Sequence, residues 1–166
     1  MEWRREAIGR IGELHPDLVM LTSSSRHPVA EGDMMLDMQV WEQGARDSFA
    51  ALAKQGTKVR FIRDTPYADY DVPGCLAQAE WDGRTQCPAP VSTAALSPDV
   101  YAAEVRAAHD FGNVKVLDLS DRMCGPDRCY LEAGEQIIYR DADHLTASYS
   151  RSLSDVLFER IKNSEQ

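Results

Sequence analysis

The residues with the clearest capacity for chemistry lie near the C-terminus, in the stretch YRDADHLT at positions 139–146. It places two carboxylates, Asp141 and Asp143, beside His144, one of four histidines in the chain. General acid–base chemistry needs an imidazole of this kind, which is oriented by a carboxylate that also stabilises its cationic form. Short Asp-x-x-His matches also arise by chance, and an exposed polar turn before a helix is the plain alternative. The spacing alone leaves both interpretations open.

The residues after the histidine predict a helix that holds this turn in place. Thr146 suits the N-cap position, because its hydroxyl can accept a bond from a free N–H of the first turn. We therefore expect His144 on a turn pinned by a buried helix. The apolar residues that recur at helical spacing along one face are Leu145, Tyr149, Leu153, Val156, Leu157 and Ile161.

Helical and strand patterns alternate along the rest of the chain, which predicts an α/β fold, a three-layer sandwich with a parallel sheet. Residues 64–96 have no convincing periodicity, and 137–139 form a short extended piece. Helices are expected at 2–14, 37–54 and 98–109, and strands at 17–22, 58–63 and 113–118.

Serines follow the first predicted strand at its carboxyl end, which is where open parallel sheets place their ligands. They are Ser23, Ser24 and Ser25. A strand can simply end in such residues, because they favour turns. The alternative is that their N–H or O–H groups act as donors at a binding crevice.

Charge and hydropathy restrict the partners. The 166 residues are 43% hydrophobic, which suffices for one domain over 1–166 with its own core. A net charge of −9 argues against nucleic acid, whose binding depends on Lys and Arg, and against anionic lipid surfaces. No apolar run is long enough to span a bilayer, and residues 1–14 are amphipathic rather than a signal peptide. We expect no nucleic-acid partner and no membrane insertion by this chain.

The four cysteines fall in loops marked by Pro and Gly, as Cys75 and Cys87 and then Cys124 and Cys129. Neither pair has the knuckle spacing or neighbouring histidines of a zinc site, so we expect no metal. Three disulfide connectivities are open, and sequence neighbours are favoured because each pair would close one local loop. Disulfides indicate an oxidising compartment. Because no export signal precedes them, we expect the chain to be a piece of a longer protein.

Several of these segments together resemble one family. The set resembles the C-terminal SGNH-hydrolase-like domain of bacterial membrane-bound acyltransferases, particularly the actinobacterial kind, over essentially the whole chain. The pattern Tyr-Arg-Asp-x-x-His-Leu-Thr is its most specific part. The matching segments are PDLVML at 16–21, DTP at 64–66, CLA at 75–77 with CP at 87–88, VLDL at 116–119, the Cys124/Cys129 loop and YRDADHLT at 139–146.

The resemblance implies an SGNH-hydrolase or flavodoxin-like fold and a catalytic triad. Asp141 would be the orienting carboxylate and His144 the general base. Asp141, rather than Asp143, is expected to accept the hydrogen bond of the ring, because a three-residue turn lets its carboxylate fold back beneath the imidazole.

One departure from the family concerns the nucleophile, a serine in a Gly-Asp-Ser block that does not occur here. Gly32-Asp33 is followed by Met34. The serines at 23–25 stand where the family carries an oxyanion-hole Asn, so they are expected to supply oxyanion donors rather than a nucleophile. Without its serine, this chain by itself is expected to be inactive.

The resemblance also implies a function at the extracytoplasmic face of the bacterial membrane. The domain would O-acylate a cell-surface glycan, typically by O-acetylation, with an acyl group delivered by a membrane acyltransferase domain and without a cofactor. Two alternatives remain. One is an SGNH esterase or deacylase, in which water replaces the glycan, and the other is a non-catalytic glycan-binding or accessory domain.

Overall fold

The computed structural model describes residues 2–26, 37–54 and 56–164. They form two compact units, which we call the sheet unit, Met1–Arg63 with Asp99–Leu117, and the motif unit, Asp64–Pro98 with Asp118–Gln166. The loop expected around Gly32-Asp33-Met34 lies outside the described residues. None of the described helices is both long and apolar enough to cross a membrane.

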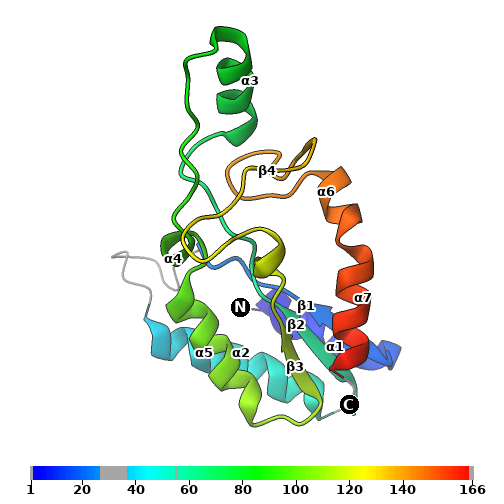
Figure 1. The fold of residues 1–166 in the computed structure, drawn as a ribbon. Helices are drawn as coiled ribbons and strands as arrows, with labels where there is room; N and C mark the ends of the chain where they lie inside the picture. The colour runs from blue at the N-terminus through cyan, green and yellow to red at the C-terminus, as the bar shows by residue number, and fades with distance from the viewer. Residues whose placement is uncertain (1, 27–36, 55, 165–166) are drawn as a thin grey trace. The chain divides into compact units, whose positions relative to one another are not determined.

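The sheet unit is built on three parallel strands in the order β1-β2-β3 (Figure 1). They are β1 (Leu18–Leu21), β2 (Lys58–Ile62) and β3 (Val114–Leu117). Parallel neighbours need a crossover, and the helices α2 (Met38–Ala53) and α5 (Pro98–His109) lie in the connections that lead to β2 and β3. This topology confirms the predicted α/β fold with a parallel sheet.

The ends of the helices in the sheet unit follow from local chemistry. Helix α1 (Glu2–Leu14) ends before His15, which has a left-handed backbone conformation with a φ of 48°. A proline follows His15 in the sequence. Helix α2 starts at Asp37, whose carboxylate accepts from the amides of Gln39 and Val40 at 2.9 and 3.3 Å. The predicted helices at 2–14, 37–54 and 98–109 are therefore confirmed to within a residue at each end.

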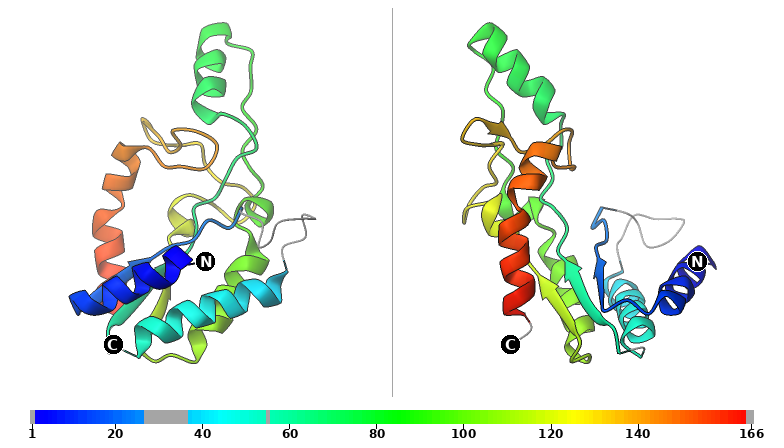
Figure 2. Two further views of the ribbon diagram at one scale, coloured as in Figure 1. Left: turned by 180° about the vertical axis from the view of Figure 1, so that it is seen from behind. Right: turned by 90° about the vertical axis from the view of Figure 1, so that its right-hand side faces the viewer.

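The core of the sheet unit covers one face of the sheet. Register partners on neighbouring strands point to the same face of a sheet, so Val19, Val59 and Val114 share one face. Phe49 from α2 meets Phe61 from β2 edge to face, with ring centroids 5.4 Å apart. Helix α1 runs alongside α2 (Figure 2), and its residues Ile8 and Ile11 pack against the same cluster.

The motif unit consists of short elements joined by turns. Cys75–Cys87 and Cys124–Cys129 are bonded, which confirms the favoured pairing. The extended piece expected at 137–139 begins in a small antiparallel hairpin. The elements are α3 (Val72–Asp82), α4 (Ser92–Ala95), the 3-10 turn η1 (Ser120–Arg122), β4 (Glu132–Ala133), β5 (Gln136–Ile137), α6 (Ala147–Ser152) and α7 (Ser154–Asn163).

Helix α3 corrects the expectation that residues 64–96 lack regular structure. Its first residues, Val72-Pro73-Gly74, have the composition of a turn. Proline is nevertheless tolerated in the first turn of a helix, where its missing N–H has no acceptor within the helix. The helix ends at Gly83, whose φ of 61° is the left-handed conformation that glycine adopts at low cost.

The single helix expected after Thr146 is divided in two at Leu153. The hydroxyl of Ser152 donates to the carbonyl of Tyr149 at 2.7 Å. In a continuous helix that carbonyl would accept the N–H of Leu153, which instead donates to Ser150 at 3.3 Å. None of the residues of α7 is fully buried, so the expected buried helix is only half-buried.

Candidate catalytic site

The turn that carries His144 begins and ends on buried backbone. Tyr139 pairs with Leu145 in an isolated antiparallel bridge, and the N–H of Thr146 donates to the carbonyl of Ile138 at 2.8 Å. Ile138 and Tyr139 are fully buried. As predicted, Thr146 caps helix α6, with its hydroxyl accepting from an amide of the first turn. The residues on both sides of His144 are therefore fixed.

A second segment of the motif unit holds the middle of the turn. The hydroxyl of Thr65 donates to the carbonyl of Asp143 at 2.8 Å, and the N–H of Ala68 donates to the carbonyl of Ala142 at 2.7 Å. These bonds fix the backbone immediately before His144. Thr65 belongs to the family segment DTP at 64–66, for which no role was predicted, and its bond makes it a positioning residue of the turn.

Asp141 and His144 form the pair that the sequence predicted. Nδ1 of His144 lies 3.0 and 2.9 Å from Oδ1 and Oδ2 of Asp141. The same carboxylate accepts from the amides of Asp143 at 3.0 Å and His144 at 2.8 Å, and Arg140 Nε lies 3.3 Å away. A carboxylate with this many donors has little freedom to rotate, so it fixes the orientation of the ring.

The same donors set the charge of Asp141. Hydrogen bonds from the amides of Asp143 and His144 lower the pKa of the Asp141 carboxyl well below its usual range, and the His144 ring and Arg140 lower it further. Partial desolvation works in the opposite direction and is outweighed. Asp141 is therefore ionised at neutral pH and can stabilise a protonated His144 during a proton transfer.

The carboxylate of Asp143 also lies close to the ring of His144. Its Oδ1 is 3.1 Å from Nδ1 of His144, so this nitrogen is placed between two carboxylates. The side chain of His144 is nevertheless 64% exposed, which leaves the ring accessible to a reacting group. A general base must be reachable in this way.

The three side chains are also the described residues that could together hold a metal ion. The ligand atoms of Asp141, Asp143 and His144 lie within 4.8 Å of one another. A metal at this point would compete with the His144 ring and with two backbone amides for the Asp141 carboxylate. The observed contacts fit an oriented imidazole, and we expect no metal in this role.

The serines predicted to border the site lie in the sheet unit, whereas Asp141 and His144 lie in the motif unit. The hydroxyl of Ser23 donates to Oε1 of Glu104 at 2.8 Å, and Glu104, only 2% exposed, also accepts from Trp41 Nε1 at 3.3 Å. In this arrangement the Ser23 hydroxyl hydrogen is engaged by a buried carboxylate.

The other two serines are half-buried Ser24 and buried Ser25. An oxyanion role for any of the three serines stays a prediction. For Ser23 it would fall to the backbone N–H, since the hydroxyl hydrogen is already donated to Glu104.

Comparison with known proteins identifies the family. The family model described as SGNH domain (fused to AT3 domains) matches residues 2–159, which is nearly the whole chain. The chain belongs to this family. The resemblance inferred from the sequence motifs is thereby confirmed, and the Asp141–His144 pair lies inside the matched region.

A solved structure supports the fold of this SGNH domain. It is the periplasmic domain of a lipopolysaccharide acetyltransferase of Salmonella ser. Paratyphi A, with a TM-score of 0.67 and 18% sequence identity. The match covers 96% of this chain and 60% of that chain, so the SGNH domain spans 60% of the length of this relative. The comparison with curated proteins gives no match.

Proposed function

We propose that this SGNH domain is the extracytoplasmic part of a membrane acyltransferase that O-acetylates a cell-surface glycan. The observation that carries the proposal is the oriented pair of Asp141 and His144 in an accessible turn. Family membership supports the link to a membrane acyltransferase domain, because the family is that of SGNH domains fused to AT3 domains. The name of the structural relative supports an acetyl group as the cargo.

In this proposal the reaction passes through an acyl-serine. Nε2 of His144 takes the proton of a serine hydroxyl, the serine oxygen attacks the acyl carbonyl, and the leaving group of the donor departs with that proton. A hydroxyl of the glycan then gives its proton to His144 and attacks the acyl-serine, which releases the ester and returns the proton to serine. Asp141 holds Nδ1 protonated, so that Nε2 is the basic nitrogen in both steps.

The serine is proposed to lie on a Gly-Asp-Ser block that precedes these residues in the whole protein. Both disulfides fit an oxidising extracytoplasmic compartment. The membrane domain would deliver the acyl donor, and the glycan would be the acceptor. An esterase would use the same pair with water as the acceptor, so the acceptor has to be tested separately from the catalytic pair.

The test compares two histidine variants of the full-length protein in its own host. His144→Ala should abolish O-acetylation of the purified surface glycan, measured by the acetyl signals in its NMR spectrum. His109→Ala, which changes an exposed histidine in the sheet unit, should leave O-acetylation at the level of the unaltered protein. Full O-acetylation by the His144→Ala protein would overturn the proposal. Acetate release to water without any glycan acetylation would replace it with the esterase.

A further inference from the structure

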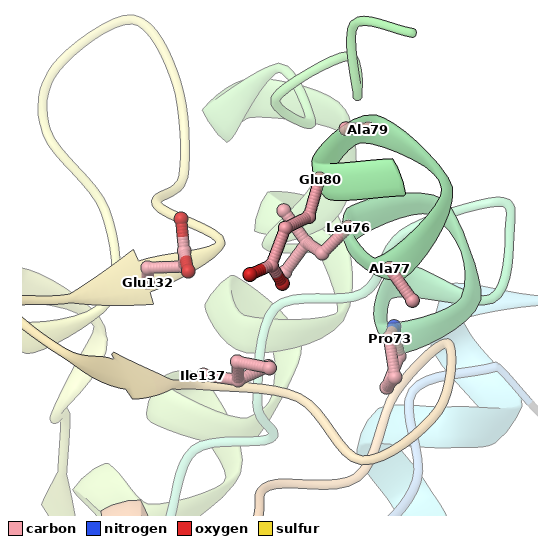
Figure 3. Close-up of a pocket in the computed structure, with 7 residues that line it drawn as sticks. All are labelled: Pro73, Leu76, Ala77, Ala79, Glu80, Glu132 and Ile137. Atoms are coloured by element: carbon pink, nitrogen blue, oxygen red, sulfur yellow. The ribbon is translucent and has the colours of Figure 1, made fainter. Parts of the chain in front are cut away.

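Helix α3 and the β4–β5 hairpin face each other across an open groove of about 490 Å³ within the motif unit (Figure 3). Its apolar surface comes from Pro73, Leu76 and Ala77 on α3 and from Ile137 on β5. Nothing in the proposed acyl transfer uses this groove. A groove of this volume is large enough for one or two six-membered rings of a ligand.

Two carboxylates, Glu80 from α3 and Glu132 from β4, extend into the groove from opposite walls (Figure 3). Neither forms a hydrogen bond or an ion pair with another described residue. The sequence of the two walls, residues 64–83 and 130–139, contains no Lys or Arg. Because an ionised carboxylate only accepts hydrogen bonds, these two exposed side chains offer acceptors to the donors of a ligand.

The charge around the groove limits which ligand can enter. The motif unit holds 15 Asp and Glu against 7 Lys and Arg, so it accounts for −8 of the net −9. A phosphorylated or carboxylated ligand would meet like charge on both walls. A ligand that is neutral or cationic and that carries hydrogen-bond donors therefore fits the groove best.

Trp81 provides an aromatic surface, which the binding of a simple cation would not require. It follows Glu80 directly and lies one helical turn beyond Ala77, and its side chain is 88% exposed. Trp81 is not one of the residues that line the groove, but its large exposed indole offers a flat apolar surface one residue after Glu80 on the same helix. A sugar ring has a C–H face that fits such a surface and hydroxyls at its rim that can donate to carboxylates.

We propose that this groove binds a neutral sugar unit of the acceptor glycan. Glu80 and Glu132 accept hydrogen bonds from its hydroxyls, and Trp81 with the apolar wall of α3 contacts its C–H face. This inference rests on the proposed function, since it assigns the acceptor subsite of the same reaction. It also predicts that the part of the glycan bound in this groove carries no charge.

The test separates acceptor binding from acyl chemistry in the full-length protein. The probe is the surface glycan purified from the host and freed of acetyl groups by mild base. Glu80→Ala, Glu132→Ala and Trp81→Ala should each raise the KM for this glycan about tenfold while kcat stays within about twofold. Release of acetate to water, measured without glycan, should be unchanged. The matched control is Glu135→Ala, an exposed carboxylate in the hairpin turn outside the groove, whose KM should be unaltered.

The outcomes distinguish this inference from the proposed function. His144→Ala should eliminate both glycan acetylation and acetate release, whereas the groove variants should affect only the first. An unchanged KM in all three groove variants would overturn the sugar site and leave the catalytic proposal intact. If EDTA raises the KM of the unaltered protein, calcium restores it and Glu80→Ala removes this response, then the groove binds a cation and the sugar assignment is wrong.

Discussion

The sheet unit and the motif unit are held together by different interactions. In the sheet unit, three strands and their helices share one apolar cluster, in which Phe49 is 1% exposed and Leu52 and Val59 are fully buried. The motif unit also buries apolar side chains, such as Ile138 and Tyr139, but its short elements are joined in addition by two disulfides and by side chains such as Thr65 and Thr146 that bond backbone groups. The pair of Asp141 and His144 thus belongs to the unit in which individual bonds supplement apolar packing. Substitutions should therefore have different consequences in the two units.

The largest effect on stability is expected from a truncation in the core of the sheet unit. Phe49→Ala should lower the free energy of unfolding by about 3–5 kcal/mol, because it removes a fully packed ring and leaves a cavity beside Phe61. Urea denaturation followed by circular dichroism measures this change.

The matched control is Phe158→Ala on α7, where the ring is 63% exposed. We expect a loss of less than about 1 kcal/mol from this change. Equal losses for the two phenylalanines would contradict the view that one apolar cluster dominates the stability of the sheet unit.

Removing a disulfide should have the next largest effect, and it should act on the motif unit. Replacing Cys75 and Cys87 by Ser should cost about 3 kcal/mol, and replacing Cys124 and Cys129 about 2 kcal/mol, because the first pair closes the longer loop. Hydrogen exchange should show lost protection around the affected loop while the β1–β3 amides remain protected. A larger loss from the shorter loop would show that chain entropy does not explain these bonds.

A smaller effect is expected from the hydroxyl that holds the catalytic turn. Thr65→Val keeps the shape of the side chain but removes its bond to the Asp143 carbonyl, which should cost about 1 kcal/mol. Amide exchange at residues 141–145 should become faster, and acyl transfer should fall several-fold. Thr65→Ser retains the hydroxyl and should restore both. If Thr65→Val leaves exchange in the turn unchanged, Thr65 does not position His144.

Low pH should destabilise the motif unit locally, because two of its carboxylates become protonated. Hydrogen bonds from Thr85 and the Arg84 amide lower the pKa of Asp82, as backbone amides do for Asp141. A carboxyl whose pKa is lower in the folded state stabilises that state above its ordinary value near 4, and this contribution is lost as the pH falls below it. Protection factors at Thr85 and His144 should therefore fall between about pH 4 and pH 2. Protection at Val59 should not fall in parallel, and a uniform decrease across both units would contradict this local origin.

The parts of the structure that follow from periodicity could be predicted, and those that depend on single side-chain bonds could not. Helix α5 was expected at 98–109 and has those bounds, because its apolar stripe and terminal charges agree. Helix α3 was missed because its start resembles a turn in composition. At the division at Leu153 one hydroxyl, that of Ser152, donates to a carbonyl inside the helix, and no periodic pattern indicates such a bond.

The contact between Asp141 and His144 was predictable because the two residues are close in sequence. Asp141 and His144 are three residues apart, and a family pattern surrounds them. Thr65 lies 78 positions from Asp143, and no local pattern connects the two. The groove between α3 and the hairpin could not be predicted either, since it depends on a helix that the sequence did not indicate.

We propose that Asp141, rather than its neighbour Asp143, orients His144 for acyl transfer. Both carboxylates lie within about 3 Å of the same ring nitrogen, so substituting each in turn is a matched comparison. The measurement is the rate of glycan O-acetylation by the full-length protein carrying Asp141→Asn or Asp143→Asn. Asp141→Asn should reduce the rate on the order of 10⁴-fold, as the corresponding change does in the serine-protease triad, and Asp143→Asn by less than about tenfold. Equal losses, or a larger loss from Asp143→Asn, would contradict the assignment.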